Sequence, residues 1–296
     1  MTAGPGAGSS FEKLSKKYLG AVEARLSRAI PADDSSLSRA MRAALLSPGK
    51  RARALVAIAC GLLFRGPEEA LLDVAAAVEA VHAASLALDD LPSMDDATLR
   101  RGEPALHVRF GQATAILAAV ALVNRAFEIL AGSRSIPAGA RGRLVAELAR
   151  AVGEAGCCGG QQADLESDPA GAALEDLESI HARKTGALFV AAARGGAIAG
   201  RASEEEIEAV TRYAKNLGLA FQIVDDLLEE EGDSSSTGKK AHGEGHRANF
   251  ARILGAATAR AIAGELTEAA ARCVAQLGRR AAPLTDLAYK LAQRRS

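Results

Sequence analysis

The chain has 296 residues and 49% of them are hydrophobic, which is enough for a sizeable core in one large domain or two ordinary ones. Its 36 basic residues balance its 36 acidic residues, so the net charge offers no general attraction to nucleic acid or anionic lipid. Aromatic residues make up only 3% and tryptophan is absent, which favours closely packed helices over a sheet.

The first ten residues, MTAGPGAGSS, are rich in small residues and predict a disordered tail over residues 1–10. They lack the basic and then apolar order of a signal peptide, and we expect no later apolar run of the roughly 18 to 20 residues that a membrane span needs. The four cysteines show no CxxC spacing, which favours reduced thiols. We therefore expect a cytoplasmic protein that does not insert stably into membranes.

Apolar residues recur at helical spacing from residue 11 almost to the C-terminus. Clusters of Gly, Pro and Asp interrupt this pattern and predict loops. These expected loops lie at 31–36, 47–49, 66–67, 132–137, 168–171, 200–203 and 232–245. The intervening segments, such as 68–91 and 106–130, predict helices, and no change of composition marks a linker. The sequence thus predicts a single all-α domain over 11–296, a large antiparallel helical bundle with its site in a central cavity.

A first acidic cluster, LALDDLPSMDD, ends one predicted helix at residues 86–96. His82, Ser85 and Asp89 fall on one face of that helix, and Pro92 should kink or end it. A helix C-terminus carries partial negative charge, so several carboxylates there require cations. Mg²⁺ prefers carboxylate oxygens and usually completes its shell with substrate phosphates. A solvated acidic turn is the alternative.

The cluster is followed by Arg100 and Arg101, which suit forked contacts with phosphate oxygens. A second helical run, AFQIVDDLLEEEGD, also ends in acids and places Asp225 and Glu229 on one face. Further basic residues occur where predicted loops meet helices, in PGKRARA, HARKTGA and TGKK, and each alone would be a solvated surface charge. Together the two acidic helix ends and these bases predict a metal-dependent site for a polyanion.

Five motifs, GKRxR, DDLPSMDDATLRRGEPALH, GGQQADL, KTGALF and FQIVDD, occur in this order over about residues 45 to 255. They closely resemble those of trans-isoprenyl diphosphate synthases of the short-chain farnesyl/geranylgeranyl type. The resemblance implies an all-α homodimer in which three Mg²⁺ ions hold an allylic diphosphate, namely dimethylallyl, geranyl or farnesyl diphosphate, beside isopentenyl diphosphate.

The resemblance also implies roles for individual residues of this chain. The implied metal ligands are Asp89, Asp90, Asp95, Asp225 and Glu229. The implied catalytic and allylic-side contacts are Arg100, Lys184, Thr185, Gln222 and Lys239. The implied isopentenyl diphosphate pocket is Lys50, Arg53, His82 and Arg101.

The expected reaction needs no side-chain nucleophile. Metal ions and cations stabilise the departing diphosphate, the isopentenyl double bond attacks the allylic cation, and the released diphosphate is the expected base. In the family, a bulky residue at the fifth position before the first motif favours the fifteen-carbon product. That position is Ala84, followed by Ser85, so we expect a deeper pocket and a twenty-carbon geranylgeranyl product, with farnesyl diphosphate as the alternative.

The chain departs from the family pattern at three places. Glu229 stands where the second motif usually ends in Asp, and GEGHRANF replaces a GKS-type segment, where His246 or Arg247 could substitute for the lysine. In addition, Ala54 replaces a proline that follows the first motif. A weakly active protein or a non-catalytic subunit of a mixed dimer is therefore the alternative.

Two other enzyme classes share parts of this pattern. Glu79-x-x-His82 and Glu178-x-x-His181 have the spacing of di-iron carboxylate bundles, but that reading leaves the Asp clusters unexplained. A class I terpene cyclase also binds metal through Asp-rich motifs, but it needs only one diphosphate and usually an aromatic pocket. The low aromatic content argues against the cyclase.

Overall fold

The computed structural model describes residues 9–167, 173–231 and 249–292, and these residues are almost entirely helical. The α-helices are α1 (Ser10–Arg28), α2 (Ser36–Leu45), α3 (Ala52–Leu63), α4 (Glu68–Asp89), α5 (Leu106–Phe110), α6 (Gln112–Gly132), α7 (Ala138–Val152), α8 (Cys157–Glu166), α9 (Leu174–His181), α10 (Ala187–Ala199), α11 (Glu204–Glu231), α12 (Phe250–Leu254), α13 (Ala256–Ala275) and α14 (Ala282–Ala292). A π-helical turn, η1 (Ala182–Gly186), a 3₁₀ turn, η2 (Arg279–Ala281), and the two-residue strands β1 (Leu99–Arg100) and β2 (Glu103–Pro104) complete the set. The predicted all-α fold is confirmed.

The helices end close to the loops predicted at 31–36, 47–49, 66–67, 132–137 and 200–203, whereas those predicted at 168–171 and 232–245 lie outside the described residues. The structure also has breaks that were not predicted, at 153–156 between α7 and α8 and at 276–278 between α13 and η2. The segment expected as one helix over 106–130 is divided into α5 and α6 at Gly111, whose φ of 84° is open to glycine but strained for other residues. The predicted N-terminal tail falls mostly outside the described residues. Its last part is ordered, since the Ser9 hydroxyl accepts a hydrogen bond from the Glu12 N–H and Ser10 begins α1.

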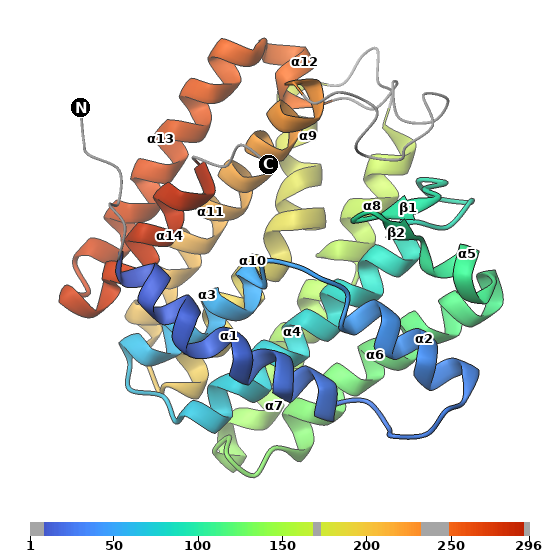
Figure 1. Cartoon of the computed structure of the whole chain (residues 1–296). Helices are drawn as coiled ribbons and strands as arrows, with labels where there is room; N and C mark the ends of the chain where they lie inside the picture. Colours follow the sequence, from blue (N-terminus) through green and yellow to red (C-terminus); the bar gives the residue numbers. More distant parts are fainter. Residues whose placement is uncertain (1–8, 168–172, 232–248, 293–296) are drawn as a thin grey trace.

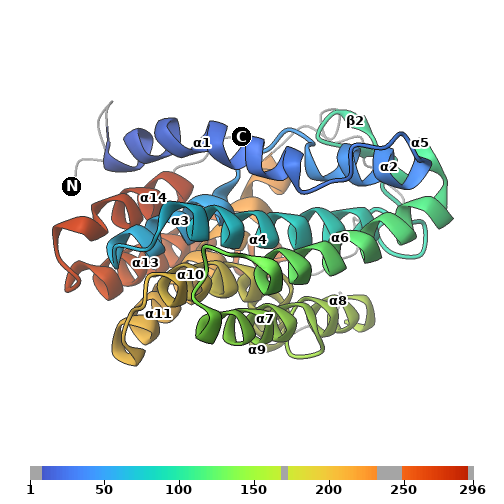
Figure 2. The ribbon, with the colours of Figure 1, turned by 90° about the horizontal axis from the view of Figure 1, so that it is seen from below.

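The helices stack in layers around α4 and α10 (Figures 1 and 2). Seen from below, α1 and α2 lie on one side of α3, α4 and α6, while α7, α10 and α11 lie on the other side (Figure 2). Helices α13 and α14 extend the bundle beside α11 and α1. Because α4 is covered on both sides, it is buried along most of its length.

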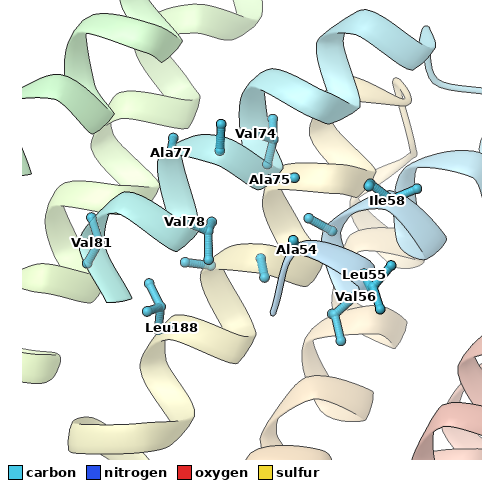
Figure 3. Packing of buried hydrophobic residues seen from close by; sticks show 14 of the residues in the cluster. Ala54, Leu55, Val56, Ile58, Val74, Ala75, Ala77, Val78, Val81 and Leu188 are labelled. Carbon is cyan, nitrogen blue, oxygen red and sulfur yellow. The ribbon is translucent and has the colours of Figure 1, made fainter. Parts of the chain in front are cut away.

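Small residues let the central helices pack closely. Ala54, Val78 and Leu188 of α3, α4 and α10 meet in the core (Figure 3). A Cβ atom added at Gly196 of α10 would lie only 2.0 Å from the carbonyl oxygen of Ala57 in α3. Only glycine fits at this contact, so the spacing of α3 and α10 is set by their backbones.

Two helices, α4 and α6, are long and apolar enough to cross a membrane by length and composition. The expectation that no apolar run reaches this length is therefore wrong. In α4, 78% of the apolar window is buried inside the bundle, as befits a central core helix. In α6 only 33% is buried, and Ile116, Leu117 and Val120 are exposed on its outer face.

Candidate active site

A cavity of about 690 Å³ opens where α4 and α11 end, and it gathers most of the predicted site residues. Those on its walls are Lys50, Arg53, His82, Ser85, Asp89, Asp95, Arg100, Arg101, Lys184, Thr185, Gln222 and Asp225. They come from the start of α3, the end of α4, the β1–β2 hairpin, η1 and α11. Segments up to 175 residues apart in sequence, from Lys50 to Asp225, therefore contribute to one site.

The end of α4 turns back so that two carboxylates face the cavity. The helix ends at Asp89, three residues before Pro92, and the Asp95 N–H then donates a hydrogen bond of 2.8 Å to the Asp89 carbonyl. Burial raises the pKa of Asp89 to about 6, Lys184 opposes this rise, and Asp95 adds to it. Added positive charge, from a cationic side chain or a metal ion, would therefore stabilise the ionised form of Asp89.

The neighbouring Asp90 has a different environment. It is 2% exposed, and its Oδ1 accepts hydrogen bonds from both Nε, at 2.8 Å, and Nη2 of Arg100. Burial lowers the pKa of Arg100, but the contact with Asp90 outweighs it and the pKa is raised. Asp90 lines an adjacent cavity of about 520 Å³ rather than the first one. Its predicted metal contact stays a prediction, and the structure gives it Arg100 as a partner.

A two-residue hairpin positions the two arginines. β1 and β2 pair antiparallel, and the residues between them, Arg101 and Gly102, have φ values of 54° and 82°. Two successive positive φ values are typical of the tightest hairpin turns. The Arg101 Nη1 donates to the Pro48 carbonyl at 2.7 Å, which ties the hairpin to the loop before α3.

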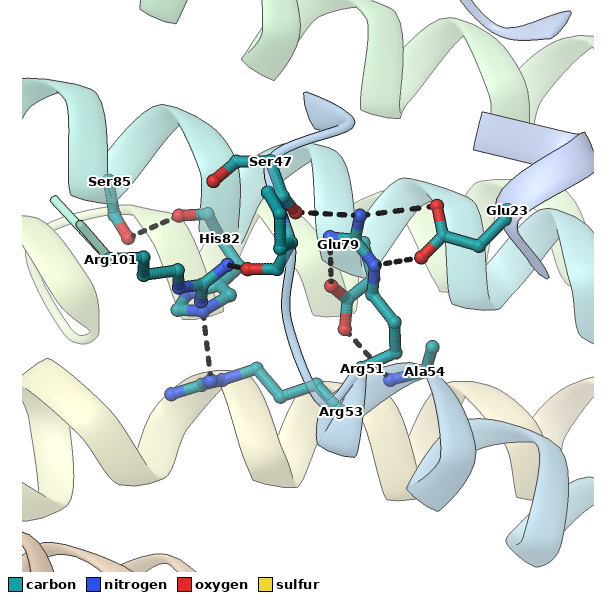
Figure 4. Close-up of polar contacts among 10 residues, drawn as sticks. Glu23, Ser47, Arg51, Arg53, Ala54, Glu79, His82, Ser85 and Arg101 are labelled. Atoms are coloured by element: carbon teal, nitrogen blue, oxygen red, sulfur yellow. Dashed lines mark hydrogen bonds and ion pairs between the residues drawn. The ribbon is translucent and has the colours of Figure 1, made fainter. Parts of the chain in front are cut away.

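Arg53 forms the cationic wall opposite the acids. Its guanidinium lies 4.6 Å above the ring of Phe189, and its Nη1 lies 3.3 Å from the His82 Nε2 (Figure 4). Burial and the charge of Arg53 hold the pKa of His82 well below its usual value, so the ring is neutral. Because a guanidinium can only donate, Nε2 accepts and the ring proton lies on Nδ1.

Lys184 and Thr185 are presented by the π-helical turn η1, a rare geometry that is frequent at functional sites. A Cβ atom added at Gly160 would lie 2.3 Å from the Lys184 nitrogen, so the glycine in GGQQADL allows α8 to approach this turn. The Lys184 Nζ contacts the Asp164 Oδ2 at 2.6 Å. The ammonium group is thereby held at the cavity wall.

Asp225, Asp226 and Glu229, near the end of α11, have different surroundings. Asp225 lines the cavity, whereas Asp226 is buried and accepts hydrogen bonds from Gln222 Nε2, at 2.8 Å, and from the Phe250 N–H, at 2.9 Å. Burial raises the pKa of Asp226 to about 6. Glu229 is exposed and is not among the lining residues. The predicted contact of Lys239, and the substitutes at His246 and Arg247, lie outside the described residues.

The family model for polyprenyl synthetase matches residues 34–272. Geranylgeranyl pyrophosphate synthase 11, chloroplastic, of Arabidopsis thaliana is 41% identical over 288 residues, covering 92% of this chain and 79% of that protein. Farnesyl diphosphate synthase of Escherichia coli is 40% identical over 253 residues, covering 84% of this chain and 85% of that protein. The chain belongs to the polyprenyl synthetase family.

Solved structures agree with this assignment. An apo crystal structure titled as an FPP/GFPP synthase from Zymomonas mobilis superposes with a TM-score of 0.86 at 33% identity, over 95% of this chain and 98% of that one. The prediction of a short-chain prenyltransferase is confirmed by this polyprenyl synthetase match. Farnesyl and geranylgeranyl synthases match at nearly equal identity, so the product length stays a prediction.

Polyprenyl synthetases use a divalent metal, and the donor set of this cavity fits one. Asp89 faces it from the end of α4, Asp95 from the turn that follows, and Asp225 from α11. Within the described residues no three such groups are close enough to form a ready metal cluster. Carboxylates on two sides of a cavity with basic walls suit a metal that completes its shell with water and substrate phosphate.

Three residues of the site were not assigned by the sequence. Asp164 pairs with Lys184, and Phe221 lines the cavity and contacts the Phe189 ring. Arg51 is buried in the connection between α2 and α3, residues 46–51, which we call the basic loop. The motif GGQQADL contains Asp164 and could have suggested it. Ala84 is 1% exposed and is not a lining residue, although its neighbour Ser85 is, so its predicted role in product length stays a prediction.

The two Glu-x-x-His pairs do not meet at one centre. The Glu79 carboxylate forms an ion pair with Arg51 and accepts a hydrogen bond from the Ala54 N–H. His181 is buried against Phe250 with ring centroids 5.3 Å apart, and burial lowers its pKa to about 4. Glu178 is exposed. The di-iron alternative therefore lacks its ligand set in the described part of the chain.

Proposed function

We propose that this polyprenyl synthetase condenses an allylic diphosphate with isopentenyl diphosphate and releases a twenty-carbon geranylgeranyl product. The observation that carries the proposal is the single cavity that places Asp89, Asp95 and Asp225 among cations from several segments. Such a cavity can hold two diphosphates only if metal ions and basic side chains offset their charge.

We propose that three Mg²⁺ ions bind with the allylic substrate, held by Asp89, Asp95 and Asp225. Bound metal would supply Lewis-acid stabilisation of the departing diphosphate. Burial raises the pKa of Asp89 to about 6 even beside Lys184 and Arg100, so a bound cation would further stabilise its ionised form, which supports this role. The exposed Glu229 would act through water or not at all.

The side chains of the cavity would then orient the two substrates and exclude water. Lys184, held by Asp164, and Arg100, held by Asp90, would contact the allylic diphosphate from fixed positions. Arg53 would bind isopentenyl diphosphate together with Lys50. The neutral His82 accepts a hydrogen bond from Arg53 through its Nε2 and so helps to hold the guanidinium at the pocket wall. Water is kept from the carbocation by the apolar helix faces behind these groups.

Product length is proposed from small side chains on α4. Ser85 lines the cavity, Ala84 beside it is buried, and neither blocks a growing chain as an aromatic residue would. The test uses purified protein, Mg²⁺, excess isopentenyl diphosphate and each allylic primer in turn, with product length measured by chromatography. A twenty-carbon product supports the proposal, and a product that stops at fifteen carbons contradicts it. Absence of product with every primer would favour the non-catalytic subunit.

We further propose a homodimer that buries the outer face of α6. Ile116, Leu117 and Val120 lie one helical turn apart or less, and Leu117 is 60% exposed. A contiguous apolar patch of this kind is costly in water and is suited to a second copy of the chain. Light scattering of the purified protein should give twice the chain mass, and Leu117→Glu should give the monomer mass.

We propose that the protein works in the cytoplasm, without nucleic acid and without stable membrane insertion. Its cysteines at 60, 157, 158 and 273 are free, as expected in a reducing compartment. The balanced charge supports the absence of a nucleic-acid partner. Fractionation of cells that express the tagged chain tests the location.

A further inference from the structure

A buried ionic network lies directly beneath the basic loop of the cavity. Arg51 is 6% exposed and lies between two carboxylates, Glu23 of α1 and Glu79 of α4 (Figure 4). Its Nε contacts the Glu23 Oε1 at 2.7 Å, and its Nη1 contacts the Glu79 Oε2 at 3.4 Å. Its Nη2 also donates to the Ser47 carbonyl at 3.0 Å, within the same loop.

The backbone at Arg51 is unusual for its position. Arg51 is the residue before the first turn of α3, its φ is 48°, and its side chain makes no capping hydrogen bond. The left-handed region costs about 1 kcal/mol for a residue with a side chain, so it needs support from elsewhere. The contacts of the guanidinium with Glu23, Glu79 and Ser47 supply that support.

Glu79 provides the cap that α3 lacks. Its Oε1 accepts a hydrogen bond of 3.1 Å from the Ala54 N–H in the first turn of α3. One turn further along α4, His82 contacts Arg53. The loop and the start of α3 are thereby joined to α4 at three points, through Arg51, Arg53 and Ala54 (Figure 4).

We propose that Arg51 and Glu79 are positioning residues that fix Lys50 and Arg53 for the second diphosphate, that of isopentenyl diphosphate. This inference rests on the proposed function. Lys50, Arg51 and Arg53 all line the cavity, but the guanidinium of Arg51 is 6% exposed and is held by Glu23, Glu79 and the Ser47 carbonyl. A rotation of the Arg51 backbone would therefore move both cations.

Stability alone is a poor reason for this network. Desolvation of two buried charges offsets much of their attraction, so well-packed apolar residues stabilise a fold about equally well. A guanidinium with contacts in three directions, however, fixes one loop conformation among several. The geometry of the network therefore fits a role in orienting the loop better than a role in stabilising the fold.

Helix α4 offers a matched control at Asp73. This carboxylate is also buried, is also paired with an arginine of α1, Arg25, and accepts a hydrogen bond from Ser133. It lies away from the basic loop and does not line the cavity. Asp73→Asn and Glu79→Gln thus remove the same charge from the same helix, and only the second touches the loop.

The test compares both variants in steady-state kinetics with each substrate varied. For Glu79→Gln, KM for isopentenyl diphosphate should rise about tenfold, as for a loss of about 1.4 kcal/mol of binding. KM for the allylic substrate and kcat at saturation should stay near wild type. Asp73→Asn should leave both KM values unchanged, although both variants lower Tm. The proposal is overturned if the two variants show the same kinetics, or if both KM values rise together.

Arg51→Lys provides the second variant, because lysine keeps the charge but cannot contact Glu23, Glu79 and Ser47 at once. Calorimetric titration with inorganic diphosphate separates this inference from the proposed function, since it needs no turnover. Arg51→Lys should bind inorganic diphosphate at least about fivefold more weakly than wild type. Equal affinity overturns the positioning role even if the enzyme makes its expected product, and weaker binding supports it even if it does not.

Discussion

The two acidic helix ends of this enzyme use the same pair of residues in the same way. In each Asp-Asp pair the first carboxylate, Asp89 or Asp225, faces the cavity. The second, Asp90 or Asp226, is buried and occupied by the protein's own donors. One residue of each pair is thus left to a ligand, while its neighbour holds the structure around it. A run of acids therefore need not be a run of ligands.

The two acidic helix ends differ in the position of the acid that follows each Asp-Asp pair, Asp95 after α4 and Glu229 in α11. Asp95 is brought back into the cavity by the turn after Pro92, whereas Glu229 lies one helical turn beyond Asp225 and is exposed. The α4 end consequently offers two carboxylates to the cavity and the α11 end offers one. This asymmetry predicts that the α4 end contributes more to metal binding.

The largest expected effect concerns the cavity-facing acid of α4. Asp89→Ala should lower turnover by about a thousandfold or more, because it removes a ligand that acts on the departing diphosphate. The variant should still unfold cooperatively, since Asp89 carries no core packing. Steady-state kinetics and thermal melts measure both quantities. Turnover near that of wild type would contradict the assignment of ligand and structural roles within the pair.

A second effect concerns the structural acid of α11. Asp226→Ala should lower the free energy of unfolding by about 2 kcal/mol, because it leaves the buried Phe250 N–H and the Gln222 amide without their acceptor. Asp226→Asn keeps an acceptor and should lose less than half as much. Urea titrations of both variants test the comparison. Equal stability of the alanine variant and wild type would show that Asp226 has no structural role.

The pH dependence of stability should follow Asp89 and Asp226. In the folded protein their pKa values are about 6, above the ordinary aspartate value of 3.8, so the folded state binds more protons than the unfolded state between these two pH values. The metal-free protein should therefore lose stability as pH rises through this window. Asp89→Asn should reduce that loss by about 3 kcal/mol. Denaturant titrations at several pH values measure the free energy of unfolding. If this free energy falls with pH as steeply in Asp89→Asn as in wild type, Asp89 is not the group responsible.

The smallest effect is expected at the exposed acid of α11. Glu229→Gln should change turnover by less than about threefold, because the side chain lies outside the cavity. Asp225→Asn is the control and should lower turnover strongly. Kinetics over a range of Mg²⁺ concentrations compare the two. A large loss in Glu229→Gln would show that the second acidic motif reaches the metal despite its longer side chain.

The sequence predicted the helical fold because apolar spacing and helix breakers are local properties. Pro92 and the Gly-rich loops marked where helices end, and the acids around Asp89 and Asp225 marked the site. Which carboxylate of each pair faces the cavity could not be predicted, because that depends on the packing of α4 and α11. The roles of Arg51 and Asp164 also depend on partners far away in sequence, Glu79 and Lys184.

The close contact between α3 and α10 has a consequence for redesign of the enzyme. Since Gly196 leaves no room beside the Ala57 carbonyl, that contact cannot be widened or narrowed by exchanging side chains. Arg53 and Phe189, which lie at the start of these two helices, keep their stacked geometry for the same reason. Directed evolution toward longer or shorter products should therefore find its accepted substitutions on α4, whose Ser85 lines the cavity, and almost none along the α3–α10 contact.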